Sequence, residues 1–330
     1  DSGETTRQQA RELYAKREPG LTLTLLWHCY GRPYYEFVQG VLRDPSIPFW
    51  AGGDSSALRG DCLLTGSTLA VLGALGIQPP KGSCTEFTIW ITPMTRHEVI
   101  DEITMFQQSP LPAGSIGKTP DGKPFFVENT GEFQNMRQAF YACMSAWCSY
   151  AKMTAEISPE DYPEDLRKLQ KALHPSEIEA VTLARSAPCV VLSDDLQFRQ
   201  YLHASNIPNA TATELLAELA PTPETLLCGM ELLQDCHYHD SVTPGLLKKL
   251  STFFYAASDD KALEDISVRT IPLIQRYIGD PDLRYGFLSA VKLAENSHQF
   301  QKTLMWLINQ SLLLFAKKHP EEFQPPATGR

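Results

Sequence analysis

The clearest pattern in the chain is a short apolar run that ends on two acidic residues and leads into a helix. Residues 187–192 read Ala-Pro-Cys-Val-Val-Leu, and Ser193, Asp194 and Asp195 follow them. An apolar run between a proline and a polar cluster is typical of a strand covered on both faces, as in a parallel sheet. We therefore expect Asp194 and Asp195 at the carboxyl end of a buried strand, with a helix over 196–204.

An earlier stretch of the chain has the same form. Residues 62–64 predict a short strand, and leucines at helical spacing follow until Gly76 supplies a left-handed end to the helix. Thr65 or Ser67 would cap this helix. Strands and helices alternate with short linkers over 61–220, which predicts βαβ units and a mainly parallel sheet.

Glutamates stand at the beginnings of two further predicted helices. Thr95 and Glu98 have the spacing of a capping box directly after a predicted strand, so Glu98 is either a cap or a metal ligand. Ser176 and Glu179 form a second capping box, which gives Glu179 a structural role and leaves Glu177 without one. An acid at the position of Glu177 is also favoured by the helix macrodipole alone.

The remaining elements follow from periodicity and from turn residues. They are a strand over 87–91, a loop or hairpin over 112–131, helices over 132–155 and 164–173, a turn over 206–210 into a short strand, a helix capped by Thr211 and Glu214, and helices near 223–236, 243–257, 261–278, 283–296 and 298–318.

These elements divide the chain into three parts. We expect a helical N-terminal segment over 1–60, an α/β domain over 61–220 and a helical C-terminal region over 221–330. The N-terminal segment is rich in aromatic residues but has few interleaved basic ones, which favours packing over stacking on nucleic-acid bases. The aromatic residues concerned are Trp27, Tyr30, Tyr34, Tyr35, Phe37, Phe49 and Trp50.

The composition is that of an ordinary globular protein, with 43% hydrophobic and 21% charged residues. A net charge of −10 argues against a constitutive nucleic-acid-binding surface but is compatible with a nuclease, whose site is itself acidic.

The eight cysteines are scattered and no secretory leader is recognisable, which favours the reducing cytoplasm. No apolar run reaches the roughly 18 residues of a membrane span, so no membrane association is expected. Because the chain begins at Asp1 rather than at a methionine, we expect it to be a fragment or a processed product.

Several acids are predicted to lie where a strand meets a helix or where a helix begins beside the sheet. Divalent cations such as Mg²⁺ and Mn²⁺ are held by a few carboxylates together with water and substrate phosphate. Converging carboxylates could therefore hold one or two ions that activate a water molecule. The candidate ligands and catalytic residues are Glu98, Glu177, Asp194 and Asp195. Asp194 or Asp195 could instead simply cap the helix that follows.

Other site chemistries have weaker support. Cys228, Cys236, His237 and His239 are zinc-type ligands, but they lack the paired spacing of established zinc sites. The chain contains no glycine-rich phosphate loop of the Walker or dinucleotide type, and no local signature of a serine or cysteine nucleophile.

Residues 61–220 resemble a PIN domain, in particular the variety found beside tetratricopeptide repeats and a Gre-type carboxyl-terminal domain in bacterial proteins. The motifs that carry the resemblance are 63–76, 92–103, 176–184 and 192–199. The resemblance implies a three-layer α/β/α fold with a mainly parallel sheet, flanked here by helical segments at both ends. It also implies a Mg²⁺- or Mn²⁺-dependent endoribonuclease, and it places Glu98, Glu177 and Asp195, together with Asp194, on the acidic positions of the family.

One position departs from the family pattern. The first strand of the family ends in a metal-binding aspartate, and the matching residue here is Thr65, a neutral hydroxyl that cannot supply the same charge. Two functions follow from this. The first is RNA phosphodiester hydrolysis at a metal-bound acidic site. The second is a catalytically inactive PIN-fold module for interaction or regulation, with protein partners on its helical flanks.

Overall fold

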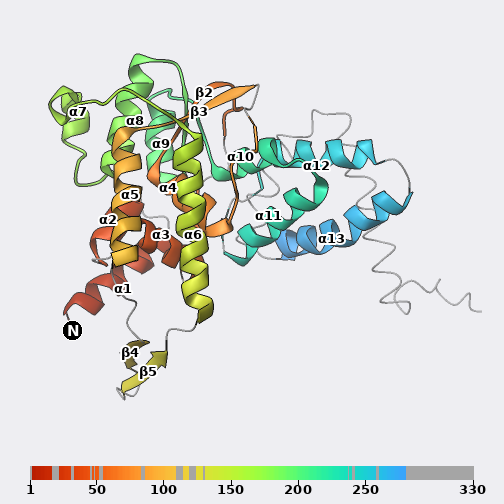
Figure 1. Ribbon diagram of the computed structural model, residues 1–330, viewed down its shortest axis with the longest axis horizontal. Helices are drawn as coiled ribbons and strands as arrows, with labels where there is room; N and C mark the ends of the chain where they lie inside the picture. Colours follow the sequence, from red (N-terminus) through yellow and green to blue (C-terminus); the bar gives the residue numbers. More distant parts are fainter. Residues whose placement is uncertain are drawn as a thin grey trace, which may run out of the picture.

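The fold is that of a computed structural model (Figure 1). It describes residues 2–279 except 17–21, 31–32, 45–46, 48, 52–54, 83–85, 109–113, 119–123, 129–130, 237, 240–241 and 258–259. No described helix is both long enough and apolar enough to cross a membrane.

A five-stranded sheet forms the centre of the described chain, and all its strands are parallel. Its order is β6-β3-β2-β7-β8. The strands are β2 (Gly60–Leu64), β3 (Phe87–Ile91), β6 (Lys152–Met153), β7 (Val190–Leu192) and β8 (Asn209–Ala210). The predicted strands at 62–64, 87–91 and 187–192 are therefore confirmed, and the first of them lies in the middle of the sheet.

Helices cover both faces of this sheet, because successive residues of each strand point to opposite sides. On β2, Cys62 and Leu64 pack with α4 (Gly66–Leu75) and α6 (Gly131–Tyr150). Leu63 faces the other side, where α8 (Pro175–Ser186) and α9 (Leu196–Ala204) cover it. The parallel α/β sheet that the alternation of elements predicts is thus confirmed, as is the helix–sheet–helix arrangement that the family resemblance implies. Helix α5 (Pro93–Gln108) contacts both α6 and α8.

In the N-terminal segment, the described residues form three helices and one short strand. The elements are α1 (Ser2–Ala15), α2 (Leu23–His28), α3 (Tyr34–Arg43) and β1 (Phe49–Trp50). As expected, its aromatic residues pack: Tyr34, Tyr35, Phe37, Phe49 and Trp50 are all buried. β1 pairs in parallel with β9 (Tyr238–His239), so this segment is joined to the C-terminal region.

The C-terminal helices stack in two rows (Figure 1). Helix α10 (Ala212–Leu219) packs on α12 (Pro244–Ala256), and α11 (Pro223–Asp235) packs on α13 (Asp260–Gly279). The predicted helices near 223–236, 243–257 and 261–278 are confirmed. Those near 283–296 and 298–318 lie outside the described residues.

Two sequence predictions were wrong about helix lengths, and one hairpin was right. The helix predicted over 132–155 ends at Tyr150, and the edge strand β6 follows it; a strand of two residues has no detectable period. The helix predicted over 164–173 is only α7 (Glu164–Arg167), followed by turns. The hairpin is β4 (Gly114–Lys118) paired with β5 (Pro124–Glu128).

Helix beginnings also differ from prediction. α5 begins at Pro93 rather than after Thr95, and the Thr92 hydroxyl accepts the Thr95 N–H at 3.1 Å. The predicted capping box of Thr95 and Glu98 is therefore wrong. Thr65 is the N-cap residue of α4, but its side chain makes no capping hydrogen bond.

Candidate functional site

The crevice at the carboxyl ends of β2 and β7 is the place where an open α/β sheet binds its ligands. In this chain the crevice is closed by neutral hydroxyl groups. The Thr65 hydroxyl donates to the Leu192 carbonyl at 2.8 Å, and the hydroxyls of Ser67 and Ser193 lie 3.1 Å apart. Thr65 thus links the two strand ends, a role for which its hydroxyl suffices and a carboxylate would lack the donor.

Asp194 is fully buried beside this crevice and binds the C-terminal region. Its carboxylate accepts the Thr68 hydroxyl at 2.6 Å and the backbone N–H of Ala212, the first residue of α10, at 3.2 Å. The Tyr238 hydroxyl also donates to it. Burial raises the pKa of Asp194, and these hydrogen bonds oppose the rise.

Asp195 is buried as well and binds the beginnings of two helices. Its Oδ1 accepts the N–H groups of Gln197 and Phe198 at 2.9 and 3.0 Å, so it caps α9. Its Oδ2 accepts the N–H of Leu23, the first residue of α2, at 2.6 Å. Because Leu23 lies 172 positions away, this contact joins the N-terminal segment to the end of β7.

The two glutamates of α8 have the opposite roles to those predicted. Glu177 accepts the His174 N–H at 2.9 Å and so forms the capping box of α8, while its Oε1 is buried without a hydrogen-bond partner. Burial raises the pKa of Glu179, polar groups of Thr92 and Met94 at the beginning of α5 oppose the rise, and its Oε2 is buried without a hydrogen-bond partner. The prediction that Glu179, paired with Ser176, caps its own helix is therefore wrong.

Glu98 lies one helical turn before Glu102 on α5, and both are held in poorly solvated positions. The side chain of Glu98 is 24% exposed, and its Oε2 lies 3.6 Å from His174 Nδ1 without a hydrogen bond. Burial, with a smaller contribution from Glu102, raises the pKa of Glu98 to about 8. Glu102 accepts the Tyr35 N–H at 3.0 Å in the first turn of α3, and burial raises its pKa to about 7.

Sequence reasoning missed Glu102. Its signal is an acid between Val99 and Ile103, which mark the buried face of α5. A similar omission concerns Glu214, predicted to cap α10 with Thr211. The carboxylate of Glu214 instead lies against Gly245 at the start of α12, and Thr211 makes no side-chain cap.

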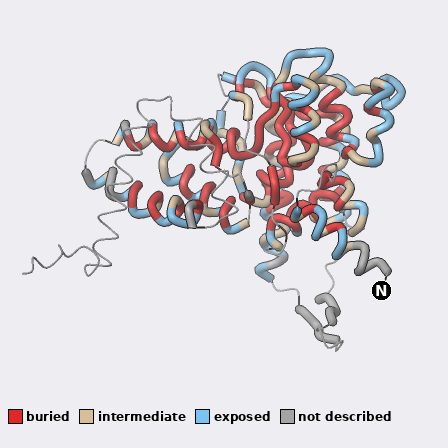
Figure 2. Tube along the Cα trace, turned by 180° about the vertical axis from the view of Figure 1, so that it is seen from behind, coloured by how far each residue is buried: buried red, intermediate tan, exposed pale blue. Residues whose placement is uncertain are grey.

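The N-terminal segment packs against the region that contains Glu177 and Asp195. The Tyr34 ring stacks on the His174 ring with centroids 4.1 Å apart, and the Thr22 hydroxyl donates to the Ala172 carbonyl. Burial lowers the pKa of His174 to about 3, so this ring carries no positive charge. Glu177, Asp194 and Asp195 are buried, and Figure 2 shows buried residues in red along much of the chain.

The structure therefore brings Glu98, Glu177 and Asp195 into one poorly solvated region. Burial, then Asp195 and Glu98, raise the pKa of Glu177, and all three acids help to raise the pKa of Tyr34. Asp194 faces away from this group, toward α10 and Tyr238. Among the described residues, none of these four acids forms an ion pair with a lysine or an arginine.

A metal ion does not fit this arrangement well. Within the described residues no group of three or more His, Cys, Asp or Glu side chains is placed to hold an ion. Both oxygens of Asp195 accept backbone N–H groups, which take three of the roughly four lone-pair sites that the carboxylate could offer a cation. Of the zinc-type residues, Cys228 contacts Arg269, and His237 lies outside the described residues.

Residues 83–204 match a family model described as the PIN domain associated with the TPR-GreAB-C-PIN system. This part of the α/β unit is thus similar to a PIN domain. The match runs from just before β3 to the end of α9, so it includes all four predicted site residues. It begins after β2 and therefore leaves Thr65 outside. No curated protein and no solved structure matches the chain.

Proposed function

We propose that this PIN-like domain serves as a structural and protein-binding module whose acidic positions hold the flanking helices, rather than as an open nuclease. The observation that carries the proposal is the pair of contacts of Asp195, which caps α9 through Oδ1 and binds the Leu23 N–H of α2 through Oδ2. An RNA phosphate could reach this carboxylate only after α2 had left it.

A general physical reason supports this role. Helix N-termini present free N–H groups and a partial positive charge, so they can offset a buried carboxylate as a cation would. Four of the buried acids receive such N–H groups. The pairs are Glu102 with α3, Glu177 with α8, Asp194 with α10, and Asp195 with α2 and α9. Thr65 places a hydroxyl, and not a further carboxylate beside Glu98, Glu177 and Asp195, between the two strand ends. A structural role of the acids does not require a carboxylate at this position.

The partners of such a module would be proteins. The matched family model is named for a system with TPR and GreAB-C components, and proteins that carry such units are the partners we propose. The net charge of −10 also disfavours a phosphate backbone as a permanent partner.

A Mg²⁺- or Mn²⁺-dependent ribonuclease is the second candidate, and one observation favours it. Glu98 Oε2 and Glu177 Oε1 are buried without hydrogen-bond partners, and no lysine or arginine of the described chain pairs with either side chain. A buried carboxylate oxygen without a hydrogen-bond partner lowers the stability of the fold unless the carboxyl group is protonated or lies beside a cation. For this function the cover of α2 and α3 would have to open.

An RNA cleavage assay with matched variants separates the two functions. Single-stranded RNA and Mn²⁺ are incubated with the whole chain and with its Asp195→Asn, Glu177→Gln and Asp101→Asn variants, the last being a control at an exposed acid of α5. We expect no cleavage above buffer for any of them. We also expect Asp195→Asn to lower stability by about 1–3 kcal/mol, because the new amide cannot serve all three N–H groups. Mn²⁺-dependent cleavage that disappears in the Asp195 and Glu177 variants but persists in the Asp101 variant would contradict the proposal.

A further inference from the structure

A small cavity lies at the amino ends of the central strands, away from the acids at their carboxyl ends. Asp61 is the second residue of β2 and lines this cavity, whereas Thr65 directly follows the strand. The volume of the cavity is about 230 Å³, and Asp61 is the one charged residue in its lining. We propose that it binds a small organic cation, namely an amine that carries one aromatic ring.

The strand ladder explains why this space is open. Pro188 has no N–H group to donate, and the pairing of β7 with β2 begins only at Val190. Strand β2 extends beyond this pairing to Gly60, so Asp61 has a ladder partner in β3 but none in β7. Asp61 and Leu63 point to the same side of the sheet because they are two positions apart. Helix α8, which covers that side, ends before Pro188 and leaves the first residues of β2 uncovered.

The floor of the cavity is apolar. Leu63 and Trp90 are register partners on β2 and β3, and the Leu63 side chain is buried. Leu183 of α8 and Pro188 add aliphatic surface to the lining. An apolar cavity of about 150 Å³ is large enough for one benzene molecule. The larger volume found here therefore suits one aromatic ring with a short chain attached to it.

Asp61 gives the cavity its preference for a cation. The Trp90 indole N–H donates to Asp61 Oδ1 at 2.8 Å, which fixes the orientation of this exposed carboxylate. Within the described residues, no lysine or arginine forms an ion pair with Asp61. Burial, and then the charge of Asp61, raise the pKa of Cys189 to about 11, so this lining thiol stays neutral. The ammonium group of Lys152 lies 5.6 Å from the centre of the Trp90 ring but does not line the cavity.

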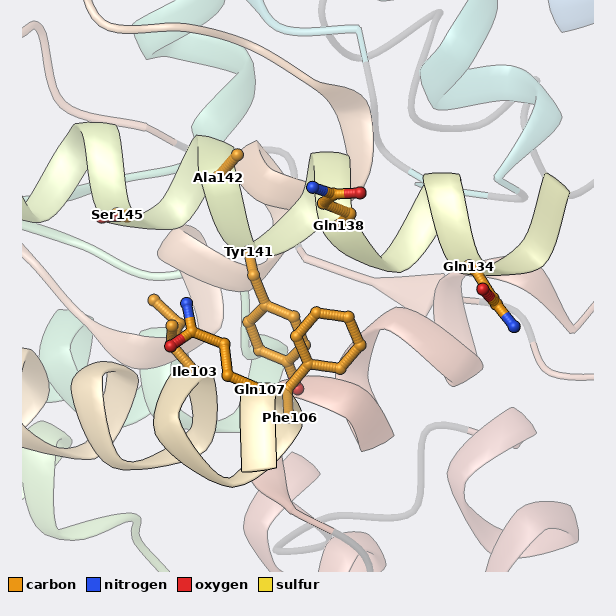
Figure 3. A pocket seen from close by; sticks show the side chains of 8 residues that line it. All are labelled: Ile103, Phe106, Gln107, Gln134, Gln138, Tyr141, Ala142 and Ser145. Atoms are coloured by element: carbon orange, nitrogen blue, oxygen red, sulfur yellow. The ribbon is translucent and has the colours of Figure 1, made fainter. Parts of the chain in front are cut away.

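The groove between α5 and α6 lacks such a determinant. Its lining includes Phe106, Gln138 and Tyr141 but no charged side chain (Figure 3), so it fits occupants of many kinds. In the cavity at Asp61, by contrast, one negative charge stands beside an apolar floor. A carboxylate or phosphate ligand would be repelled there, and a neutral ligand would gain no charge-assisted hydrogen bond. An ammonium group attached to an apolar ring satisfies both parts of the lining.

The test compares phenethylamine, which is protonated at neutral pH, with the neutral phenethyl alcohol. Binding to the whole chain is measured by isothermal titration calorimetry. Asp61→Asn removes the charge but keeps an oxygen that can accept the Trp90 N–H. Its matched control is Glu86→Gln, at an exposed acid outside the lining whose backbone carbonyl accepts the Gly60 N–H. Melting temperatures establish that both variants fold.

We expect phenethylamine to bind the original chain with a Kd of about 1 mM or below, as is usual for a ligand of this size. Phenethyl alcohol should bind at least about fivefold more weakly, because it cannot form the charge-assisted bond. Asp61→Asn should weaken binding of the amine by about the same factor and leave that of the alcohol unchanged, while Glu86→Gln should leave both within about twofold.

Three results would overturn the proposal. The first is an amine that does not bind at concentrations up to about 10 mM, and the second is equal affinity for the amine and the alcohol. The third is equal weakening of the amine by Asp61→Asn and Glu86→Gln. An arginine-containing peptide that displaces phenethylamine and binds more tightly would assign the cavity to a protein partner, and would also overturn the proposal. None of these measurements involves RNA, so their outcome is independent of the cleavage assay.

Discussion

Replacing Glu98 with glutamine should prevent much of the loss of stability that the original chain undergoes as the pH rises. The pKa of Glu98 is raised from 4.5 to about 8, first by burial and then by the neighbouring Glu102. Glutamine has almost the same shape but stays neutral at every pH. Since Glu98 Oε2 accepts no hydrogen bond, the amide displaces no existing partner there.

The sign follows from proton binding. Between pH 4.5 and 8 the folded chain keeps the proton on Glu98 while the unfolded chain releases it, so the free energy of unfolding falls as the pH rises. The contribution is complete below pH 4.5 and is lost by about pH 8. Each pH unit of pKa difference corresponds to about 1.4 kcal/mol, which gives an upper limit of about 5 kcal/mol. Because the side chain is 24% exposed, we expect roughly half of that, about 2–3 kcal/mol.

The measurement is urea unfolding at pH 5, 6, 7 and 8 in the presence of a chelator. We expect the Glu98→Gln variant to match the original chain at pH 5 and to exceed it by about 2–3 kcal/mol at pH 8. Asp101→Asn, at a side chain that is 62% exposed, should stay within about 0.5 kcal/mol of the original at each pH. Parallel pH profiles for the original chain and the Glu98→Gln variant would refute the reasoning. Stabilisation by Mg²⁺ at pH 8 that Glu98→Gln abolishes would instead favour the ribonuclease.

Two further substitutions test the packing around the sheet. Tyr238→Phe removes the hydroxyl that donates to Asp194 and should lower the free energy of unfolding in urea by about 1–3 kcal/mol. Its control is Tyr201→Phe, which removes a hydroxyl that accepts a hydrogen bond from the exposed Arg185 and should lower that free energy by less than about 1 kcal/mol. Equal losses in the two variants would contradict the role of Asp194. Gly73→Ala places a Cβ 2.8 Å from Met144 Cγ and 3.0 Å from the Phe140 ring, so the melting temperature should fall, while Gly40→Ala, with no atom within 4 Å, should raise it because alanine favours a helix by about 0.5–1 kcal/mol. A rise for both glycine variants would show that the contact of α4 with α6 is looser than described.

Local patterns in the sequence were sufficient for most of the architecture. The apolar run before Asp194 predicts β7, and the leucines before Gly76 predict α4, because burial on one face imposes a period on neighbouring residues. The left-handed Gly76, with φ of 66°, also follows from local chemistry. The alternation of such units predicts a parallel α/β fold, and the residues of the last motif indicate the PIN-like family over 83–204.

Local capping rules failed where distant segments compete for the same groups. The boxes predicted for Thr95 with Glu98, Ser176 with Glu179 and Thr211 with Glu214 are all absent. In each case the acid or the helix start found a different partner. Asp195 binds the start of α2 as well as that of α9, because a buried carboxylate is most stable where several N–H groups converge, whatever their sequence separation.

The sequence by itself determined strands β2, β3 and β7, most of the helices and the identity of the acids at the carboxyl edge of the sheet, since each of these depends on neighbouring residues. The two-residue strand β6 has no such pattern. Only the tertiary structure decided that Asp195 would meet Leu23 and that Asp194 would meet Tyr238. Both contacts join segments far apart in the chain, and no periodicity reports such pairs. The physical reason is desolvation: once the flanking helices bury these carboxylates, their hydrogen-bond partners are determined by which N–H and O–H donors the fold brings near.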